Sequence, residues 1–473
     1  MTERTLIKGG IVLTQDDALG ELNGADVLVE DDRIAEVGRD LSVADARVID
    51  AAGDIVIPGF IDTHRHTWET SIRTCAPDYP LITYFGSILD KFAPHYRPED
   101  VHAATLWGAL EDINAGITGL VDWAHIINTP DHADAGVNAL QESGIRSVYA
   151  YGFGNTSLVD WWFGPDYTGS VLRIDGPDAR RIRQQYFASD DGRVTMGLAT
   201  RGTGFCKPDV VKMEWELAKE LGINITVHVG MDRFGYTKGQ ITALRDMDLL
   251  YPNTTYVHAS HFTDEEWALV RDSGGNVSFA PQIEVQMGHG WAPAVTALEY
   301  GIPIGLSSDV ATTASADQFT QMHAIFGSER GRKHQSAWDS DLDGLEASPG
   351  LITSRQVLRW ATLGGAEVAG IADRTGSITP GKKADIVIID GSAVNVAPII
   401  DPVGAVVCAA DISNVKTVFV DGDILKQDFR LAASLTEPRK KVEASRDYLL
   451  SKFGEPQEGW LTASSGREVA AAG

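Results

Sequence analysis

The sequence predicts an α/β fold in which a (β/α)8 TIM-type barrel carries a small β-sandwich domain built from both chain ends. Three observations lead to this prediction. The chain of 473 residues exceeds the roughly 250–300 residues at which one hydrophobic core usually stops growing. Its middle alternates short apolar runs with helical patterns about eight times, as a parallel barrel requires. Both of its ends are rich in strand patterns.

The small domain is predicted from period-two patterns at the two ends of the chain. Alternating Val, Ile and Leu, broken by Gly and Asp-Asp turns, indicate strands within residues 5–14, 25–38 and 46–60. Residues 384–390 and 415–423 have the same character. Because these two strand-rich blocks flank a long middle, we expect one domain assembled from both ends.

The barrel is predicted from apolar runs of the kind found in parallel strands that are buried on both faces. These runs are residues 116–123, 145–153, 193–200, 223–230, 254–260, 275–281 and 302–309. Several of the helical stretches between them end in Gly just before the next run, which is a common helix stop. Catalytic groups are therefore expected at the carboxyl ends of the strands.

These patterns set the expected domain boundaries. Residues 1–57 and 375–430 are expected to form the small β domain, and residues 58–374 the (β/α)8 barrel. Residues 431–473 are expected to carry a C-terminal helix followed by a mobile tail, because the chain ends in Ser, Gly and Ala.

Charge and cysteine usage exclude several classes of function. Forty basic and sixty-six acidic side chains give a formal net charge of −26, which disfavours binding to nucleic acid or to a membrane surface. Cys75, Cys206 and Cys408 form no CxxC pair, as is typical of a reducing compartment. Neither a secretory leader nor a membrane-spanning run is visible. We expect a cytoplasmic homodimer or higher homo-oligomer with a small-molecule substrate.

Metal-ligating side chains follow several of the predicted strands. The first strand leads into His64 and His66, and residues two apart on a strand point to the same side. Later strands lead into His228, His258 and Asp309. Imidazole nitrogens together with one carboxylate suit zinc or iron and leave a position for water. The sequence therefore predicts a metal site at one end of the barrel.

Four segments resemble the amidohydrolase superfamily of metal-dependent hydrolases. Its strand-one signature is similar to PGFIDTHRH, its strand-six segment to VHASHFTDEE and its strand-eight segment to GLSSD. Its return into the small β domain is similar to ATLGGAEVAGIADRTGSITPGKKADIVIID. The resemblance covers roughly residues 3–430 and is greatest to the branch that contains cytosine, guanine and S-adenosylhomocysteine-type deaminases and the triazine hydrolases.

The resemblance implies a mononuclear site in which His64, His66, His228 and Asp309 bind one divalent ion. We expect Zn²⁺, with Fe²⁺ as the alternative. Binuclear relatives carry a lysine on strand four, and the corresponding segment here, GLATRGTG, has none. His258 would then bind or polarise the substrate or the attacking water.

The expected reaction is hydrolysis of a C–N bond by metal-bound hydroxide. A bound divalent ion lowers the pKa of its water from ~15.7 toward ~7. Asp309 is expected to accept the proton of that water, and His258 to stabilise charge on the attacked centre. The expected substrate is a small nitrogen-containing heterocycle that undergoes deamination or cyclic amide or amidine hydrolysis.

One departure from the family pattern leaves other reactions open. Deaminases of this branch usually place a Glu three residues after the strand-five histidine, where Met231 stands here. Because Met cannot move a proton, either Asp232, Glu69 or Glu284 takes over or the reaction needs no such shuttle. The alternatives are a hydrolytic dehalogenase, a metal-dependent lyase or decarboxylase and, in another class, a non-catalytic scaffold.

Further side chains are expected near the substrate. Trp68 and Glu69 directly follow the histidine pair, and Arg201 ends a strand, where its cation could pair with a substrate carboxylate or carbonyl. The loop at 281–290 and the segment around His125 also follow strands. The expected substrate contacts are Trp68, Glu69, Arg201, His261, Glu284 and Asp232.

Overall fold

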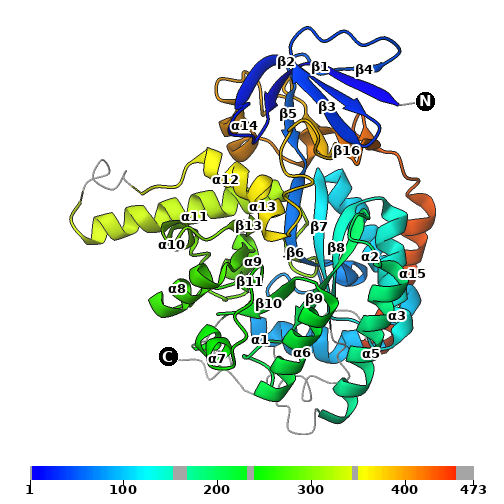
Figure 1. The fold of residues 1–473 in the computed structure, drawn as a ribbon, viewed down its shortest axis with the longest axis vertical. Coiled ribbons are helices and arrows are strands. Elements are labelled where there is room, and N and C mark those ends of the chain that lie inside the picture. Colours follow the sequence, from blue (N-terminus) through cyan, green and yellow to red (C-terminus); the bar gives the residue numbers. More distant parts are fainter. Residues whose placement is uncertain (1–2, 153–167, 232–238, 343–349, 454–473) are drawn as a thin grey trace.

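The structure is a computed structural model that describes residues 3–152, 168–231, 239–342 and 350–453. Its strands form two nine-stranded sheets. One is a barrel with helices on its outside, and the other is a smaller sheet beside one end of that barrel (Figure 1). Among the described residues, no helix combines the length and the apolar character needed to cross a bilayer.

The barrel closes through a divided eighth strand. The parallel sheet has the order β13-β12-β11-β10-β9-β8-β7-β6-β14. Its two end members, β13 and β14, are separated in sequence by only Ser307 and Ser308. Since β13 pairs with β12 and β14 pairs with β6, one interrupted strand joins the two edges. The predicted parallel barrel is confirmed. The barrel strands are β6 (Phe60–His66), β7 (Ile117–Ala124), β8 (Arg146–Gly152), β9 (Val194–Thr200), β10 (Ile225–Val229), β11 (Thr255–His258), β12 (Asn276–Phe279), β13 (Ile304–Leu306) and β14 (Asp309–Val310).

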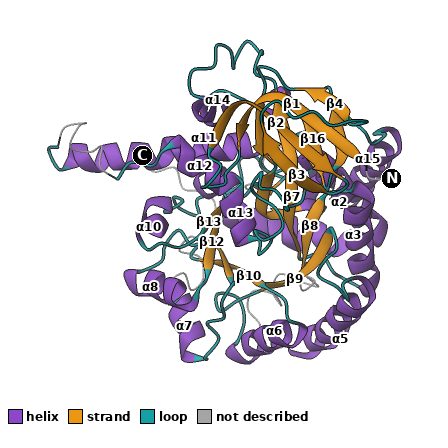
Figure 2. Cartoon of the chain, turned by 45° about the horizontal axis from the view of Figure 1, so that its top comes forward, coloured by secondary structure: helices purple, strands orange, loops and turns teal. Residues whose placement is uncertain are grey.

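Helices surround the barrel, and α11 extends away from it (Figure 2). The helices between successive strands are α2 (Pro98–Asn114), α3 (Pro130–Ser143), α5 (Thr168–Tyr186), α6 (Pro208–Leu221), α7 (Gln240–Asp246), α8 (Asp264–Ser273), α9 (Pro281–Gln286) and α10 (Ala294–Glu299). After the last strand come α11 (Gln318–Asp339), α12 (Ser354–Ala361), α13 (Leu363–Val368) and α15 (Thr436–Phe453). Shorter helical segments are η1 (Thr67–Ile72), α1 (Leu81–Tyr84), η2 (Phe85–Phe92), η3 (Ala93–His95), α14 (Pro402–Cys408) and η4 (Ile412–Asn414).

The smaller sheet joins the two ends of the chain. Its order is β18-β17-β16-β15-β5-β1-β2-β3, with β4 paired to β1. β5, from the N-terminal block, pairs antiparallel with β15, from the C-terminal block. Apolar side chains of both blocks share one buried cluster, which includes Ile7, Val27, Ile386 and Phe419. Its strands are β1 (Arg4–Leu13), β2 (Glu21–Glu30), β3 (Arg33–Gly38), β4 (Arg47–Asp50), β5 (Ile55–Pro58), β15 (Ile386–Ile389), β16 (Val415–Val420), β17 (Asp423–Gln427) and β18 (Arg430–Leu431).

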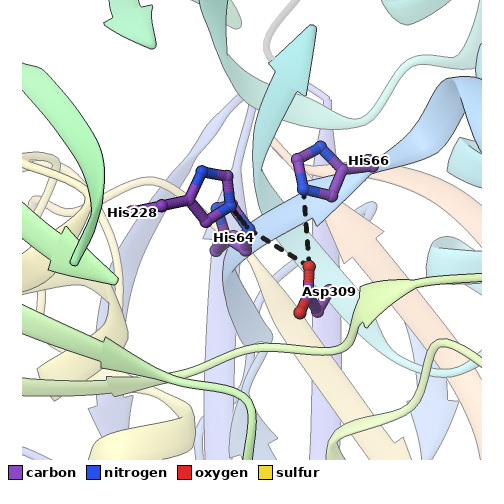
Figure 3. Close-up of side chains that lie close together, drawn as sticks. All are labelled: His64, His66, His228 and Asp309. Atoms are coloured by element: carbon purple, nitrogen blue, oxygen red, sulfur yellow. Dashed lines mark hydrogen bonds and ion pairs between the residues drawn. The ribbon is translucent and has the colours of Figure 1, made fainter. Parts of the chain in front are cut away.

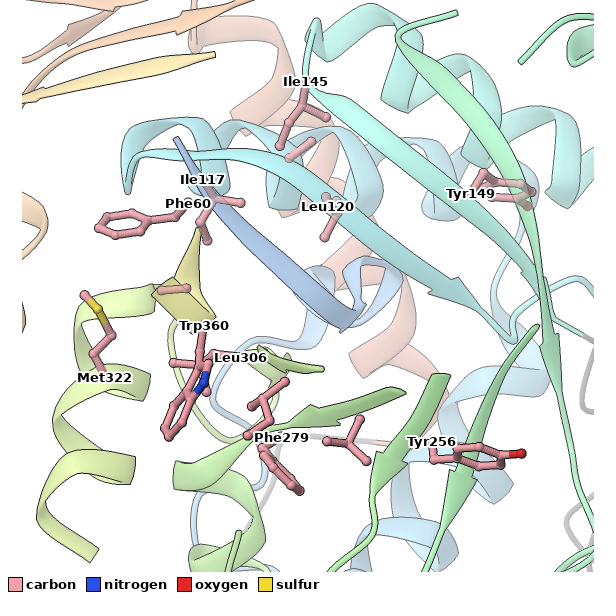
Figure 4. Packing of buried hydrophobic residues seen from close by; sticks show 14 of the residues in the cluster. Phe60, Ile117, Leu120, Ile145, Tyr149, Tyr256, Phe279, Leu306, Met322 and Trp360 are labelled. Carbon is pink, nitrogen blue, oxygen red and sulfur yellow. The ribbon is translucent and has the colours of Figure 1, made fainter. Parts of the chain in front are cut away.

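The largest hydrophobic cluster lies between the barrel strands and their covering helices (Figure 4). Phe60 of β6, for example, packs edge-on against Phe319 of α11 with ring centroids 5.1 Å apart. Full burial of a side chain of this size stabilises the fold by about 1.5–3 kcal/mol. The cluster therefore fixes the barrel wall from which the functional side chains project.

A glycine allows the chain to pass from the small sheet into the barrel. β5 runs directly into β6 through Gly59, and a Cβ on this residue would lie 2.0 Å from Thr118 Oγ1 of β7. Only glycine permits so close an approach. Because β5 belongs to the small sheet, that sheet lies at the amino-terminal ends of the barrel strands, and their carboxyl ends point away from it (Figure 1).

A buried arginine ties the small sheet to the barrel. Arg146, the first residue of β8, donates from Nε to Asp385 Oδ2 at 2.6 Å and also pairs with Asp421. Arg146 and Asp385 are both almost fully buried. Charges at this depth are tolerated only because they neutralise one another.

Replacing this arginine should destabilise the whole protein. Arg146→Met leaves buried carboxylates without their cation, and we expect a loss of about 3–5 kcal/mol in the free energy of unfolding, measured by chemical denaturation. Arg180→Met, which breaks the exposed pair with Glu220, is the control and should cost less than about 1 kcal/mol. Equal effects of the two substitutions would contradict the assignment of Arg146 as the link.

Candidate metal centre

Four side chains from three strands meet at the carboxyl end of the barrel. His64 and His66 come from β6, His228 from β10 and Asp309 from β14. One potential ligand atom from each lies within 4.8 Å of all the others. The rings and the carboxylate point toward a common centre (Figure 3). Barrel closure brings Asp309 beside β6 although more than half of the chain separates them in sequence.

The distances fit a set of ligands for one ion. His64 Nε2 lies 3.1 Å from His228 Nε2 and 3.2 Å from Asp309 Oδ1. His66 Nε2 lies 3.4 Å from the same oxygen. Three imidazole nitrogens and a carboxylate oxygen are the donors that zinc and other divalent transition metals prefer. These residues could therefore hold a single metal ion.

The protonation of the rings also fits a metal. Burial lowers the pKa of His64, His66 and His228 below the ordinary histidine value, so the rings are neutral. His66 Nδ1 lies 3.0 Å from the carbonyl oxygen of Trp123. That nitrogen must carry the hydrogen, so Nε2 keeps its lone pair for the centre. Burial alone would raise the pKa of Asp309, but its histidine neighbours lower it below the ordinary value.

Other residues of β6 hold the strand in place. The carboxylate of Asp62 accepts hydrogen bonds from the backbone N–H groups of His64 and Ser308, both at 3.2 Å. Asp62 thereby links β6 to the break in the eighth strand, one residue before Asp309. On β6 between the two histidines, Arg65 pairs with Glu111 of α2 at 2.6 Å. On β6, His64 and His66 thus belong to the cluster, while Asp62 and Arg65 fix the strand to its neighbours.

Two site residues have a left-handed backbone conformation. His258 has φ +74° and Asp309 has φ +60°. For residues other than glycine this conformation costs roughly 1–2 kcal/mol each. Such strain persists where the surroundings determine it, and it is characteristic of functional sites.

A fourth histidine, which lies beside the cluster, pairs with a buried carboxylate. His258, at the end of β11, has Nε2 3.9 Å from Asp309 Oδ2 and Nδ1 3.3 Å from Glu284 Oε1. Glu284, in α9, also accepts the backbone N–H of Ala280 at 2.9 Å. Burial raises the pKa of Glu284, while the contact with His258 opposes that rise. The pair can orient one imidazole and hold a proton beside Asp309.

A mostly apolar pocket opens beside these groups. Its wall comes from the loops after several strands and from α1 and η2. Met231 is part of this wall. It stands at the position where the deaminases that the sequence resembles usually have a glutamate. The lining residues are His66, Leu81, Tyr84, Phe85, Leu89, His125, Phe205, His228, Met231, His258, Met287, His289, Asp309 and Val310.

Two of the expected substrate contacts lie behind the pocket wall. The indole nitrogen of Trp68 donates to His125 Nδ1 at 3.3 Å, and His125 rather than Trp68 lines the pocket. The carboxyl group of Glu69 bonds to the hydroxyl of Tyr84 and accepts a hydrogen bond from Thr312 Oγ1 at 2.8 Å. Burial raises the pKa of Glu69 to about 8. Trp68 therefore holds His125 in the pocket wall, and Glu69 holds Tyr84 there.

The other expected contacts have different positions. Arg201 is buried at the end of β9, where its Nε donates to Glu214 Oε1 at 2.7 Å, and it is not part of the pocket wall. His261 is exposed in the turn after β11. Glu284 touches His258 from the side away from the pocket lining. Asp232 lies outside the described residues.

The structure adds wall residues that were not among the expected contacts. Tyr84, Phe85 and Phe205 carry no motif that points to a site. His289 falls in the loop at 281–290, which the sequence marks only because it follows a strand. Its position shortly after a predicted strand is the sequence signal that could have identified His289 as a site residue.

Comparison with known sequences places the chain among metal-dependent hydrolases. Residues 55–425 match the profile described as "Amidohydrolase family". A 5'-deoxyadenosine deaminase of Methanosarcina mazei is 27% identical over 451 residues, which cover 93% of this chain and 96% of the relative. A 5-methylthioadenosine/S-adenosylhomocysteine deaminase of Symbiobacterium thermophilum is 29% identical over 437 residues, which cover 90% and 94%.

Solved structures share the fold over nearly the whole chain. Atrazine chlorohydrolase from Arthrobacter aurescens TC1, complexed with zinc, has a TM-score of 0.80 at 23% identity and covers 93% of this chain and 100% of its own. An adenosine deaminase from Xanthomonas campestris with bound zinc has a TM-score of 0.78 at 20% identity, with coverage of 94% and 98%. At these identities the likeness establishes the fold.

Removal of one imidazole tests the metal centre. His66→Ala should lower the zinc content well below that of the unmodified protein, because it removes one of the four protein donors that converge on the centre. Metal analysis of the purified protein measures this, and circular dichroism should show an intact fold. His323→Ala, an exposed histidine of α11, is the matched control. Stoichiometric zinc in the His66 variant would remove this residue from the ligand set.

Proposed function

Because this chain belongs to the amidohydrolase family, we propose that it is a mononuclear zinc hydrolase that removes an amino group from an uncharged nitrogen heterocycle of the adenosine type. The observation that carries the proposal is the convergence of four metal-ligand atoms beside a mostly apolar pocket. The substrate class is supported by the deaminases of 5'-deoxyadenosine and 5-methylthioadenosine that resemble the chain over nearly its full length.

The proposed ligands are His64, His66, His228 and Asp309, and the proposed ion is Zn²⁺ rather than Fe²⁺. Zinc-containing structural neighbours support this choice, and the neutral imidazoles of the cluster suit a divalent transition metal in general. When bound, such an ion supplies a water molecule whose pKa is lowered toward ~7. One ion is favoured over two because β9 carries no lysine.

The chain's own residues would handle the protons. In the overall reaction, water adds its oxygen to the ring carbon, and the amino group takes up a proton and leaves as ammonia. Asp309 can accept the proton of the water, and His258 Nε2 lies 3.9 Å from the second oxygen of that carboxylate. Glu284 holds the opposite ring nitrogen of His258 at 3.3 Å. The His258–Glu284 pair would thus transfer the proton that related deaminases transfer through a glutamate at the position of Met231.

Met231 also supports a second candidate, hydrolytic dehalogenation. A halide leaves as an anion and needs no proton, so an apolar side chain at this position would be no disadvantage. The structural likeness to atrazine chlorohydrolase shows that the same fold accommodates such an enzyme. Lyase or decarboxylase chemistry has no comparable support among the described residues.

A panel of substrates distinguishes these candidates. Zinc-loaded protein is incubated with 5'-deoxyadenosine, 5'-methylthioadenosine and atrazine, and ammonia and chloride are measured. Deamination predicts ammonia release with kcat/KM of about 10⁴ M⁻¹s⁻¹ or more for a nucleoside, and dehalogenation predicts chloride from atrazine. Protein that binds no zinc and transforms none of the three would instead be the scaffold.

The proposed role of Glu284 predicts a specific loss. Glu284→Gln removes the carboxylate that orients His258 and should lower kcat by about 10²–10⁴-fold with zinc content unchanged. Glu329→Gln, which also changes a buried glutamate but lies outside the pocket wall, is the matched control for burial. If the Glu284 variant kept full turnover, the proton would have to travel by another route.

We further propose that the protein works as a homo-oligomer in the cytoplasm. Cys75, Cys206 and Cys408 form no disulfide among the described residues, which supports a reducing compartment. The exposed indoles of Trp291 and Trp338 support a contact between copies.

A further inference from the structure

We propose that His289 is a substrate-contacting residue, which offers a ring nitrogen to the edge of an uncharged heterocycle in the pocket. This inference rests on the proposed function, because it names how the same pocket would recognise its substrate. It concerns a residue that neither binds the metal cluster nor belongs to the His258–Glu284 pair.

The strongest evidence is that His289 is buried without partners. Its side chain is 2% exposed and lines the pocket. Neither Nδ1 nor Nε2 has a hydrogen-bond partner among the described residues. A neutral imidazole has one donor and one acceptor, and a buried polar group that lacks partners weakens the fold. A ligand in the pocket would supply those partners.

A structural histidine of the same chain shows the contrast. His132 in α3 is also buried. Its Nδ1 lies 2.8 Å from Thr129 Oγ1 and its Nε2 lies 2.9 Å from the carbonyl oxygen of Tyr96. Both nitrogens of His132 are thus satisfied within the protein, as is usual for a buried histidine. His289 is equally enclosed but directs its polar atoms to no protein group that the structure describes.

The position of His289 suits recognition close to the reacting atoms. Its ring lies 4.6 Å from the ring of His258, at an interplanar angle of 84°. The next residue, Gly290, has φ +125°, and a Cβ there would lie 3.0 Å from His261 Nε2. The backbone N–H of Gly290 also donates to the carbonyl oxygen of Glu284 at 3.2 Å. The loop is therefore fixed against β11 and α9, and His289 is held beside the pocket.

A second imidazole shares the wall. His125 is buried beside His66, with ring centroids 4.2 Å apart. Because Trp68 donates to its Nδ1, the hydrogen of the neutral His125 ring lies on Nε2. Besides His66, His228 and His258, the pocket thus contains His125 with a fixed tautomer and His289, which can adopt either tautomer to suit a ligand.

The remaining wall points to an uncharged planar ligand. Among the described residues that line the pocket there is no lysine or arginine. Burial lowers the pKa of His289 to about 3, so its ring supplies no cation at neutral pH. Aromatic and thioether side chains such as Phe85, Phe205 and Met287 can contact the faces of a ring. Neutral imidazoles pair with the donors and acceptors on its edge.

Substitution of His289 separates a recognition role from a structural one. His289→Leu should keep zinc and an equal or higher Tm, because it removes an unsatisfied buried polar group, and it should weaken binding of 5'-deoxyadenosine about tenfold or more. His289→Gln keeps a donor and an acceptor and should recover part of that affinity. His132→Leu, the matched control, should lower Tm. Affinity is taken from the KM for ammonia release where the zinc-loaded full chain converts the probe, and from isothermal titration calorimetry where it does not.

Each outcome of these measurements decides the matter. If His289→Leu lowers Tm as His132→Leu does and leaves the affinity unchanged, His289 is structural and the inference is wrong. It is equally overturned if the unmodified protein binds neither 5'-deoxyadenosine nor melamine, or binds adenosine monophosphate more tightly than 5'-deoxyadenosine. Binding of an uncharged probe that depends on His289, without release of ammonia, would refute the proposed deamination but leave the inference standing.

Discussion

Closure of the barrel between β6 and β14 is the constraint on which the site depends. The eighth strand is broken at Ser307 and Ser308, and the carboxylate of Asp62 holds the break against β6. This pairing brings Asp309 to within 3.4 Å of two histidines of the first strand. Without closure, donors that lie far apart in the sequence would not share a centre, and the pocket beside them would lack one wall.

The two ends of the barrel differ in how their buried polar groups are satisfied. At the amino-terminal ends of the strands, Arg146 and its aspartates are buried as paired charges that hold the small sheet. At the carboxyl ends, the chain instead carries strained backbone at His258 and Asp309, and the ring nitrogens of His289 lack hydrogen-bond partners in the part of the chain that the structure describes. The paired charges of Arg146 and its aspartates stabilise the fold. The strained backbone and the unsatisfied nitrogens at the carboxyl ends lower stability, but they leave polar atoms that a metal or a ligand could bind.

The carboxylate missing at Met231 changes how the site can move protons. A methionine in the wall makes the pocket more apolar. Outside the metal cluster, Glu284 is a buried carboxylate that touches a pocket histidine, and it comes from α9, which follows β12 rather than β10. Glu69, another candidate from the sequence, bonds to Tyr84 and Thr312 behind the wall. The fold can therefore supply acid–base groups to one centre from several strand ends, as (β/α)8 barrels commonly do.

The sequence alone determined the fold class, the family and the residues that could bind a metal, because these depend on local periodicity and on short motifs such as PGFIDTHRH. It also placed Glu284 and His289 after a strand, but it could not distinguish Trp68 behind the wall from His125 on it. Tertiary structure alone decided that the Arg201 guanidinium donates to Glu214 and that the ring nitrogens of buried His289 have no hydrogen-bond partner among the described residues. Those outcomes depend on which side chains approach through space, and no local pattern records that.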